Sequence, residues 1–109
     1  MRDIPVAHEA GSRGIRQVLS PVVNIADDVR WGRVQETYGE DPFLASIMGT
    51  AFVEAFEHAG IVTTPKHFVA NVGEGGRDSY PIDYSERRLA ERYFPPFEAA
   101  VRQAHARSV

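Results

Sequence analysis

The sequence contains no cysteine, which excludes disulfide bonds and thiolate metal sites. Its apolar runs fall far short of the ~20 residues that a membrane-spanning helix needs, so we expect no membrane segment. It has 12 basic and 15 acidic residues, a net charge of −3, without the clustered basic surface typical of nucleic-acid binding. The stretch Met1–Pro5 has no apolar signal-peptide core. The cellular location stays unknown, because any signal would lie upstream of this sequence.

Several common functional motifs are also missing. The four histidines (His8, His58, His67 and His105) do not have the spacing of metal ligands. The glycine-rich stretch at 73–76 lacks the Gly-Lys-Ser/Thr ending of a phosphate-binding loop, and no Gly-x-Ser-x-Gly nucleophile motif occurs. We therefore expect neither a metal nor a cofactor.

What the sequence does contain is typical of a folded chain. Its 109 residues are enough for one domain at most, and they are 43% hydrophobic and 25% charged. The strongest local pattern is an apolar stripe along Pro42–Ala59, which predicts an amphipathic helix. Asp41 suits the N-cap, Pro42 the first turn and Gly60 the C-terminal stop. A second helix is expected after Ser85.

This second helix should kink or break near Arg92–Pro96, because prolines cannot donate backbone hydrogen bonds and crowd the preceding turn. A shorter helix is expected over Val6–Gly14. Runs of β-forming residues predict strands at Val18–Ile25 and Ile61–Val69, each interrupted by a proline, and a third strand should begin at Arg107–Val109.

The expected order of elements is therefore strand, helix, strand, helix, strand, which favours an α/β fold with βαβαβ units and parallel strands. Long segments, Ala26–Glu40 and Ala70–Tyr84, follow the two predicted strands. Such loops form the active sites of α/β barrels, and a complete barrel takes about 250 residues. The pattern predicts the α/β class but does not by itself predict a barrel.

The two long loops hold most of the residues able to bind a ligand. Arginine, lysine and histidine there offer several hydrogen-bond donors, which suits a polar, hydroxyl-rich molecule. A structural interpretation stays open beside it. Arg30 and Arg33 could belong to a solvated, ion-paired loop, Trp31 could be a core residue, and His67 could be a structural histidine.

Several motifs in order resemble glycoside hydrolase family 3, in the N-terminal barrel domain of its β-glucosidase and β-xylosidase-like members. The resemblance covers nearly the whole chain and implies that residues 1–109 are part of a TIM-type (β/α)8 catalytic barrel. One departure is at Asp27-Asp28-Val29, where many members read Arg-Asp-Pro. The matching motifs are SPVVNI (20–25), RWGR (30–33), ETYGEDP (36–42), KHF (66–68), EGGR (74–77) and SER (85–87).

The resemblance also implies the roles of particular residues. Arg33, Lys66, His67 and Arg77 match positions that line the subsite for the non-reducing sugar, where they are expected to donate hydrogen bonds to sugar hydroxyls. Lys66 and His67 are neighbours, so they can share one ligand only if the backbone is irregular there. Glu36 and Asp41 are expected to brace the loop or cap the helix.

The implied reaction is retaining hydrolysis of terminal β-D-glycosyl residues, with a β-linked glycoside or oligosaccharide as substrate. The family's nucleophile and acid/base are expected beyond Val109, so the 109-residue chain alone is expected to be inactive and to rely on flanking sequence for the rest of the barrel. Two alternatives remain: a non-catalytic carbohydrate-binding or vestigial product, and a small α/β domain whose loops are ordinary surface.

Overall fold

The computed structural model describes residues 5–109. Helix α1 (Pro5–Ser12) precedes strand β1 (Gln17–Val18), a 3-10 turn η1 (Val34–Glu36) and the long helix α2 (Pro42–His58). Strand β2 (Val62–Thr63) and the C-terminal helical segment follow. That segment consists of α3 (Glu86–Arg88), a π-helical turn η2 (Leu89–Tyr93) and α4 (Phe94–Arg102).

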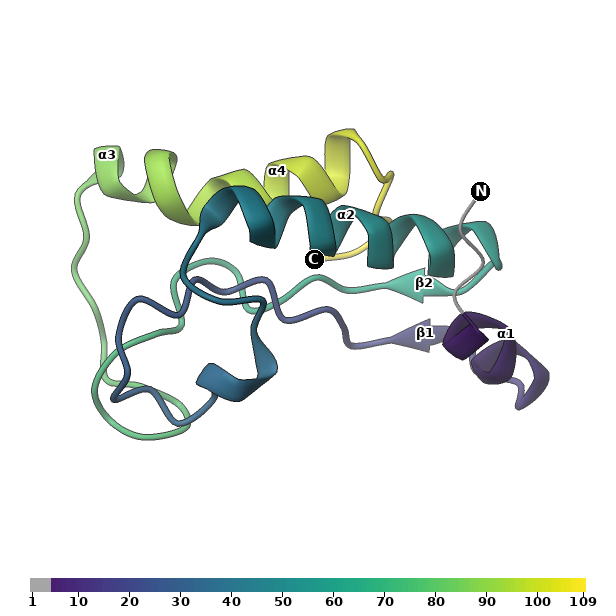
Figure 1. Cartoon of the computed structure of the whole chain (residues 1–109), viewed down its shortest axis with the longest axis horizontal. Helices are drawn as coiled ribbons and strands as arrows, with labels where there is room; N and C mark the ends of the chain where they lie inside the picture. The colour runs from purple at the N-terminus through teal and green to yellow at the C-terminus, as the bar shows by residue number, and fades with distance from the viewer. Residues whose placement is uncertain (1–4) are drawn as a thin grey trace.

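The two strands are parallel, with Gln17 opposite Val62 and Val18 opposite Thr63. Their regular pairing is much shorter than predicted, although the two segments stay side by side as far as a parallel bridge between Val22 and Lys66. Prolines lie between the strands and the bridge, and proline cannot donate to a ladder. The predicted α/β class with parallel strands is confirmed (Figure 1).

The predicted third strand is wrong: within the described residues, 107–109 form no strand. The backbone N–H of Arg107 donates instead to the Glu57 carboxylate (3.4 Å), which the Arg107 guanidinium also contacts. These contacts tie the C-terminal segment to α2, and it finds no ladder partner among residues 5–109.

The helix ends are as predicted. The Asp41 carboxylate accepts hydrogen bonds from the backbone N–H groups of Phe43 and Leu44 (3.0 and 3.3 Å), and α2 ends just before Gly60. Gly60 has a φ of +81°, in the region that favours glycine. Ser85 caps α3 by accepting from Arg88 N–H (3.2 Å). The predicted break near Arg92–Pro96 takes the form of the π-helical turn just before α4.

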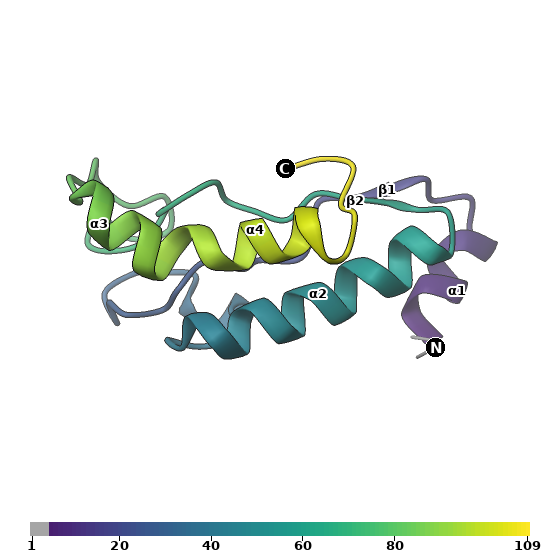
Figure 2. The ribbon, with the colours of Figure 1, turned by 90° about the horizontal axis from the view of Figure 1, so that it is seen from above.

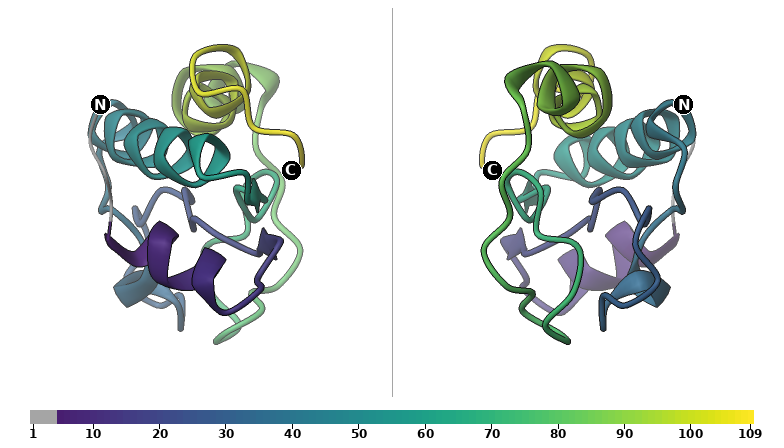
Figure 3. Two further views of the ribbon diagram at one scale, coloured as in Figure 1. Left: turned by 90° about the vertical axis from the view of Figure 1, so that its right-hand side faces the viewer. Right: turned by 90° about the vertical axis from the view of Figure 1, so that its left-hand side faces the viewer.

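Helices α2 and α4 run beside one another along the length of the molecule (Figure 2). In the end-on views, α2 lies between α1 and α4 (Figure 3). Three clusters of buried side chains hold this arrangement. The largest lies beneath the two long loops, and its buried members are Val22, Ile25, Trp31, Ala45, Ala70, Val72 and Tyr93.

Only part of the apolar stripe predicted along α2 is buried in the core. Phe56 is buried, whereas Phe43, Leu44, Ile47 and Met48 are 45–71% exposed. The face that packs on the strands carries smaller residues, because the helix approaches closely there: a Cβ at Gly49 would lie 2.9 Å from Val23 Cγ1. The bulky side chains therefore lie on other faces of the helix.

Candidate functional site

The two long loops meet at the carboxyl end of the parallel strands, at the left of Figure 1. The backbone N–H of Gly32 donates to Gly76 O (2.9 Å), and the indole N–H of Trp31 donates to Arg77 O (3.0 Å). A Cβ at Gly32 would lie 2.9 Å from Arg77 N, so this approach requires glycine. Trp31 is 2% exposed, which confirms its interpretation as a core residue.

Arg30, next to Trp31, is exposed to solvent where the two long loops meet. Its guanidinium donates to both carboxylate oxygens of Asp28 (3.0 and 2.7 Å) and to Glu74 across the loops (2.9 Å). Hydrogen bonds from Arg30 lower the pKa of Asp28 to about 2. Arg30 thus fits the interpretation of an ion-paired surface loop, because its charge is already matched by two carboxylates.

Arg33 is in a different environment, only 7% exposed. Its Nε and NH2 groups donate to the two oxygens of Glu36, both at 2.8 Å. Hydrogen bonding from Arg33 lowers the pKa of Glu36, so this pair is charged at neutral pH. Glu36 therefore braces the loop, as predicted. A guanidinium has five N–H donors, so those of NH1 stay available to a ligand. The paired hydrogen bonds to Glu36 fix the direction in which they point.

Lys66 and His67 follow β2 in an irregular stretch with cis peptide bonds before His67 and before Val69. This fits the expected irregularity at the Lys-His pair. Both side chains are half-buried. Within residues 5–109, no hydrogen bond or ion pair engages the Lys66 ammonium, so its three donors are open to a ligand.

The charged groups of Arg33, Lys66 and Arg77 all lie close enough to His67 to act on its ionisation. Burial lowers the pKa of His67, and the nearby charges of Arg33, Lys66 and Arg77 lower it further, while Glu36 opposes them. His67 is therefore neutral at neutral pH. Arg77 is exposed, and among residues 5–109 its guanidinium pairs with one carboxylate, that of exposed Asp78 (2.8 Å).

Two bracing groups near the site were not singled out from the sequence. The first is Asn24, 1% exposed, whose side-chain amide bonds to the backbone on both sides of Phe68 and to the His67 ring. Its signal in the sequence is a lone amide inside an otherwise apolar run. A buried amide of this kind requires hydrogen-bond partners.

The second bracing group is Asp27, the first residue of the Asp27-Asp28-Val29 stretch at which this sequence differs from many family members. Its Oδ2 accepts a hydrogen bond from the buried Tyr93 hydroxyl (2.6 Å) and lies near the guanidinium groups of Arg88 (3.3 Å) and Arg92 (3.6 Å). The carboxylate thus ties the first loop to the C-terminal helical segment. Burial raises the pKa of the Tyr93 hydroxyl, and the bond to Asp27 raises it further.

Among the described residues, no group of three or more His, Asp or Glu side chains is arranged to hold a metal ion. Over the same range, none of the helices combines the length and apolar character needed to cross a membrane.

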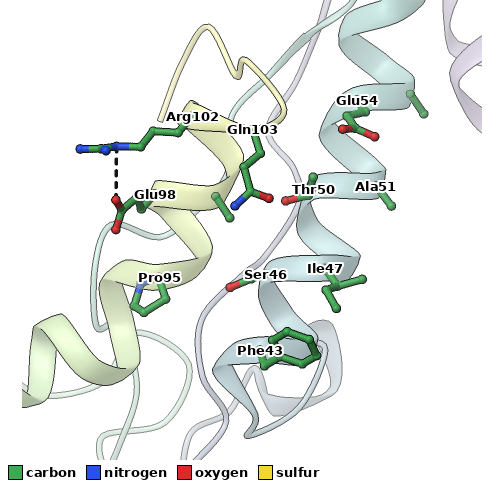
Figure 4. Close-up of a pocket in the computed structure, with 12 residues that line it drawn as sticks. Phe43, Ser46, Ile47, Thr50, Ala51, Glu54, Pro95, Glu98, Arg102 and Gln103 are labelled. Carbon is green, nitrogen blue, oxygen red and sulfur yellow. Dashed lines mark ion pairs between the residues drawn. The ribbon is translucent and has the colours of Figure 1, made fainter.

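A groove of about 740 Å³ lies between α2 and α4 (Figure 4). None of the four candidate site residues lines it: Arg33, Lys66, His67 and Arg77. One wall is α2, which contributes both apolar and polar side chains, and the other is α4, where Glu98 and Arg102 form an ion pair (3.2 Å). The groove is a space between packed helices, away from the residues that gather at the loops.

The parallel strands, with long loops at their carboxyl ends, fit part of an α/β barrel domain. The sequence profile described as "Glycosyl hydrolase family 3 N terminal domain" matches residues 4–109. The chain belongs to this family, and the predicted family and barrel class are confirmed.

Two curated relatives illustrate the similarity. A "Beta-xylosidase" of Formosa agariphila is 44% identical over 94% of this chain. A "Periplasmic beta-glucosidase" of Salmonella typhimurium is 37% identical over 87% of it. The aligned part covers only 16% and 13% of these relatives, so the chain spans about a sixth of their length or less.

Solved structures agree. A β-glucosidase from Erythrobacter marinus superposes with a TM-score of 0.87 at 35% identity, over 94% of this chain and 15% of its own. A mutant β-glucosidase from Listeria innocua in complex with laminaribiose gives a TM-score of 0.86 at 35% identity, over 94% of this chain and 16% of its own.

Proposed function

We propose that residues 1–109 are part of the catalytic barrel domain of a longer retaining β-glycosidase, and that they supply the residues holding the sugar at the non-reducing end. The observation that carries the proposal is that Arg33 and Arg77, from the two long loops, lie near Lys66 and His67, which follow β2, at one end of the parallel strands. The relatives, named β-glucosidases and β-xylosidases, suggest a terminal β-glucoside or β-xyloside as substrate.

The arrangement suits such a ligand. Sugar hydroxyls both donate and accept hydrogen bonds, and this cluster offers charged donors beside one neutral ring. Lys66 and Arg77 carry open donors, whereas the Glu36 fork holds the Arg33 guanidinium in place before any ligand arrives. Preorganised donors of this kind orient a sugar at little entropic cost.

The proposal assigns no catalytic carboxylate to this chain. Retaining hydrolysis needs a nucleophile and an acid/base flanking the bond that breaks. The carboxylates nearest the cluster are engaged otherwise: Glu36 with Arg33, and Asp78 with Arg77. On this proposal both catalytic groups lie in the rest of the longer protein.

The purified 109-residue chain is therefore expected to show no hydrolysis of p-nitrophenyl β-D-glucoside or β-D-xyloside above the rate in buffer. The longer protein containing it should hydrolyse at least one of them with retention of configuration. Release of nitrophenol by the short chain, at a rate comparable with that of the longer protein, would refute this division of roles.

A further inference from the structure

The orientation of the Asn24 amide is fixed by three backbone partners. Its Nδ2 donates to the carbonyl oxygens of His67 (3.0 Å) and Val69 (3.2 Å), while its Oδ1 accepts from the backbone N–H of His67 (2.8 Å). Carbonyl oxygens only accept and backbone N–H groups only donate. Turning the amide over would break all three bonds, so the atom facing the His67 ring is the oxygen.

That oxygen decides where the imidazole carries its proton. Asn24 Oδ1 lies 2.9 Å from Nδ1 of His67. An amide oxygen has no hydrogen to donate, so Nδ1 must be the donor. A neutral imidazole has one ring proton, which leaves Nε2 as an acceptor. Burial and the neighbouring positive charges lower the pKa of His67, which is consistent with the neutral ring.

We infer that Asn24 is a positioning residue that holds His67 in its Nδ1-protonated tautomer, so that Nε2 accepts a hydrogen bond from a ligand hydroxyl. His67 then differs from Arg33, Lys66 and Arg77, which can only donate. A hydroxyl group satisfies both kinds of partner, because it accepts from a cation and donates to Nε2. A fluorine in place of that sugar hydroxyl would have no hydrogen to donate to Nε2, so it could not replace the hydroxyl at His67. The inferred acceptor role of His67 differs from the expectation, implied by the family resemblance, that all four residues donate to sugar hydroxyls.

The tautomer follows from the contacts of Asn24 alone, whereas the role of Nε2 toward a sugar rests on the proposed function. A purely structural Asn24 would hold the backbone at 66–69 without affecting the ring. The two roles are separable because the ring proton has its own spectroscopic signature.

The test is long-range 1H–15N NMR of the histidine rings in the longer protein that contains this chain, with 15N-labelled histidine, recorded above the titration range of His67. His67→Gln identifies the signals by removing them. We expect Nδ1 to show the shift of a protonated ring nitrogen and Nε2 that of an unprotonated one. A protonated Nε2, or the averaged shifts of a freely exchanging ring, would overturn the inference.

Asn24→Asp gives a second readout. A carboxylate accepting from Nδ1–H stabilises the charged ring, so the midpoint of the His67 titration should move to higher pH. Asn71→Asp is the matched control, because the Asn71 side chain bonds to the hydroxyl of Ser79. It should leave the His67 signals in place. If Asn24→Asp fails to fold, the His67 tautomer measured in the unaltered protein still tests the inference.

Adding methyl β-D-glucoside or methyl β-D-xyloside to the same sample separates the tautomer from the proposed function. A sugar-dependent shift of Nε2, with Nδ1 still protonated, supports both. A protonated Nδ1 with no response to either sugar supports the Asn24 inference and counts against the sugar site. Loss of the Nδ1 proton on addition of sugar would contradict the acceptor role of Nε2.

Discussion

Replacing Arg33 with alanine in the longer enzyme is expected to lower kcat/KM for an aryl β-glucoside or β-xyloside by roughly 10- to 100-fold. Hydrogen bonds to a charged group contribute about 1.5–3 kcal/mol, and each 1.4 kcal/mol is a factor of ten in rate. Arg33 is nearly buried and fixed by Glu36, so water or a neighbouring side chain cannot easily replace its donors. Steady-state kinetics measure the effect.

Arg30→Ala is the matched control. This arginine is in the same loop, but its side chain is 59% exposed and paired with Asp28 and Glu74. Exposed ion pairs contribute little, so its loss should change kcat/KM far less than the loss of Arg33. Equal effects of the two substitutions, or an unchanged rate for Arg33→Ala, would favour the interpretation of the loops as ordinary surface.

Replacing Asn24 with alanine is expected to have the largest effect on stability, lowering the free energy of unfolding by on the order of 3 kcal/mol. The substitution leaves the His67 N–H and the His67 and Val69 carbonyls without their partner in a partly buried environment. Each buried polar group left unsatisfied costs about 1–3 kcal/mol, offset in part by local rearrangement. Urea denaturation followed by circular dichroism measures the change.

Asn71→Ala tests whether this effect is specific to Asn24. Its half-buried side chain has a single described bond, from the Ser79 hydroxyl (2.9 Å), so a net loss of only about 1 kcal/mol is expected. A similar midpoint for Asn24→Ala and the unaltered chain would show that the amide does not hold the 66–69 segment.

The parts of the fold that were predictable are those determined by nearby residues. Caps depend on a side chain and the backbone two or three positions away, so Asp41 and Ser85 were identifiable as N-caps. The apolar stripe of α2 indicated a helix correctly, but it did not show which side chains are buried. That depends on the close approach of Gly49 to Val23, which are far apart in the sequence.

In the candidate site, too, features carried by local motifs were predictable, whereas contacts between distant residues were not. The family resemblance, carried by whole motifs, led to Arg33, Lys66, His67 and Arg77, and their grouping as a sugar site remains a proposal. Composition and spacing alone gave only a polar loop. The bracing contacts of Asn24 and Asp27 were missed because their partners are more than 40 positions away. No local pattern contains such a pairing.

The exposed side chains of α2 suit the proposal of a longer protein. Phe43, Leu44, Ile47 and Met48 cover adjacent turns of one helix, and contiguous apolar surface of this kind usually packs against other parts of a protein. In a barrel, each helix of the outer ring has neighbours on both sides. Further barrel helices would cover this surface.

Sequencing the gene on both sides of this segment tests the central claim most directly. The account predicts a reading frame that continues past Val109 into a later strand carrying an aspartate in the context of the family's nucleophile, with an acid/base residue further on. A stop codon directly after Val109, together with no coding sequence in frame upstream, would contradict it. The chain would then be a whole protein without catalytic carboxylates, and hydrolysis would no longer be its function.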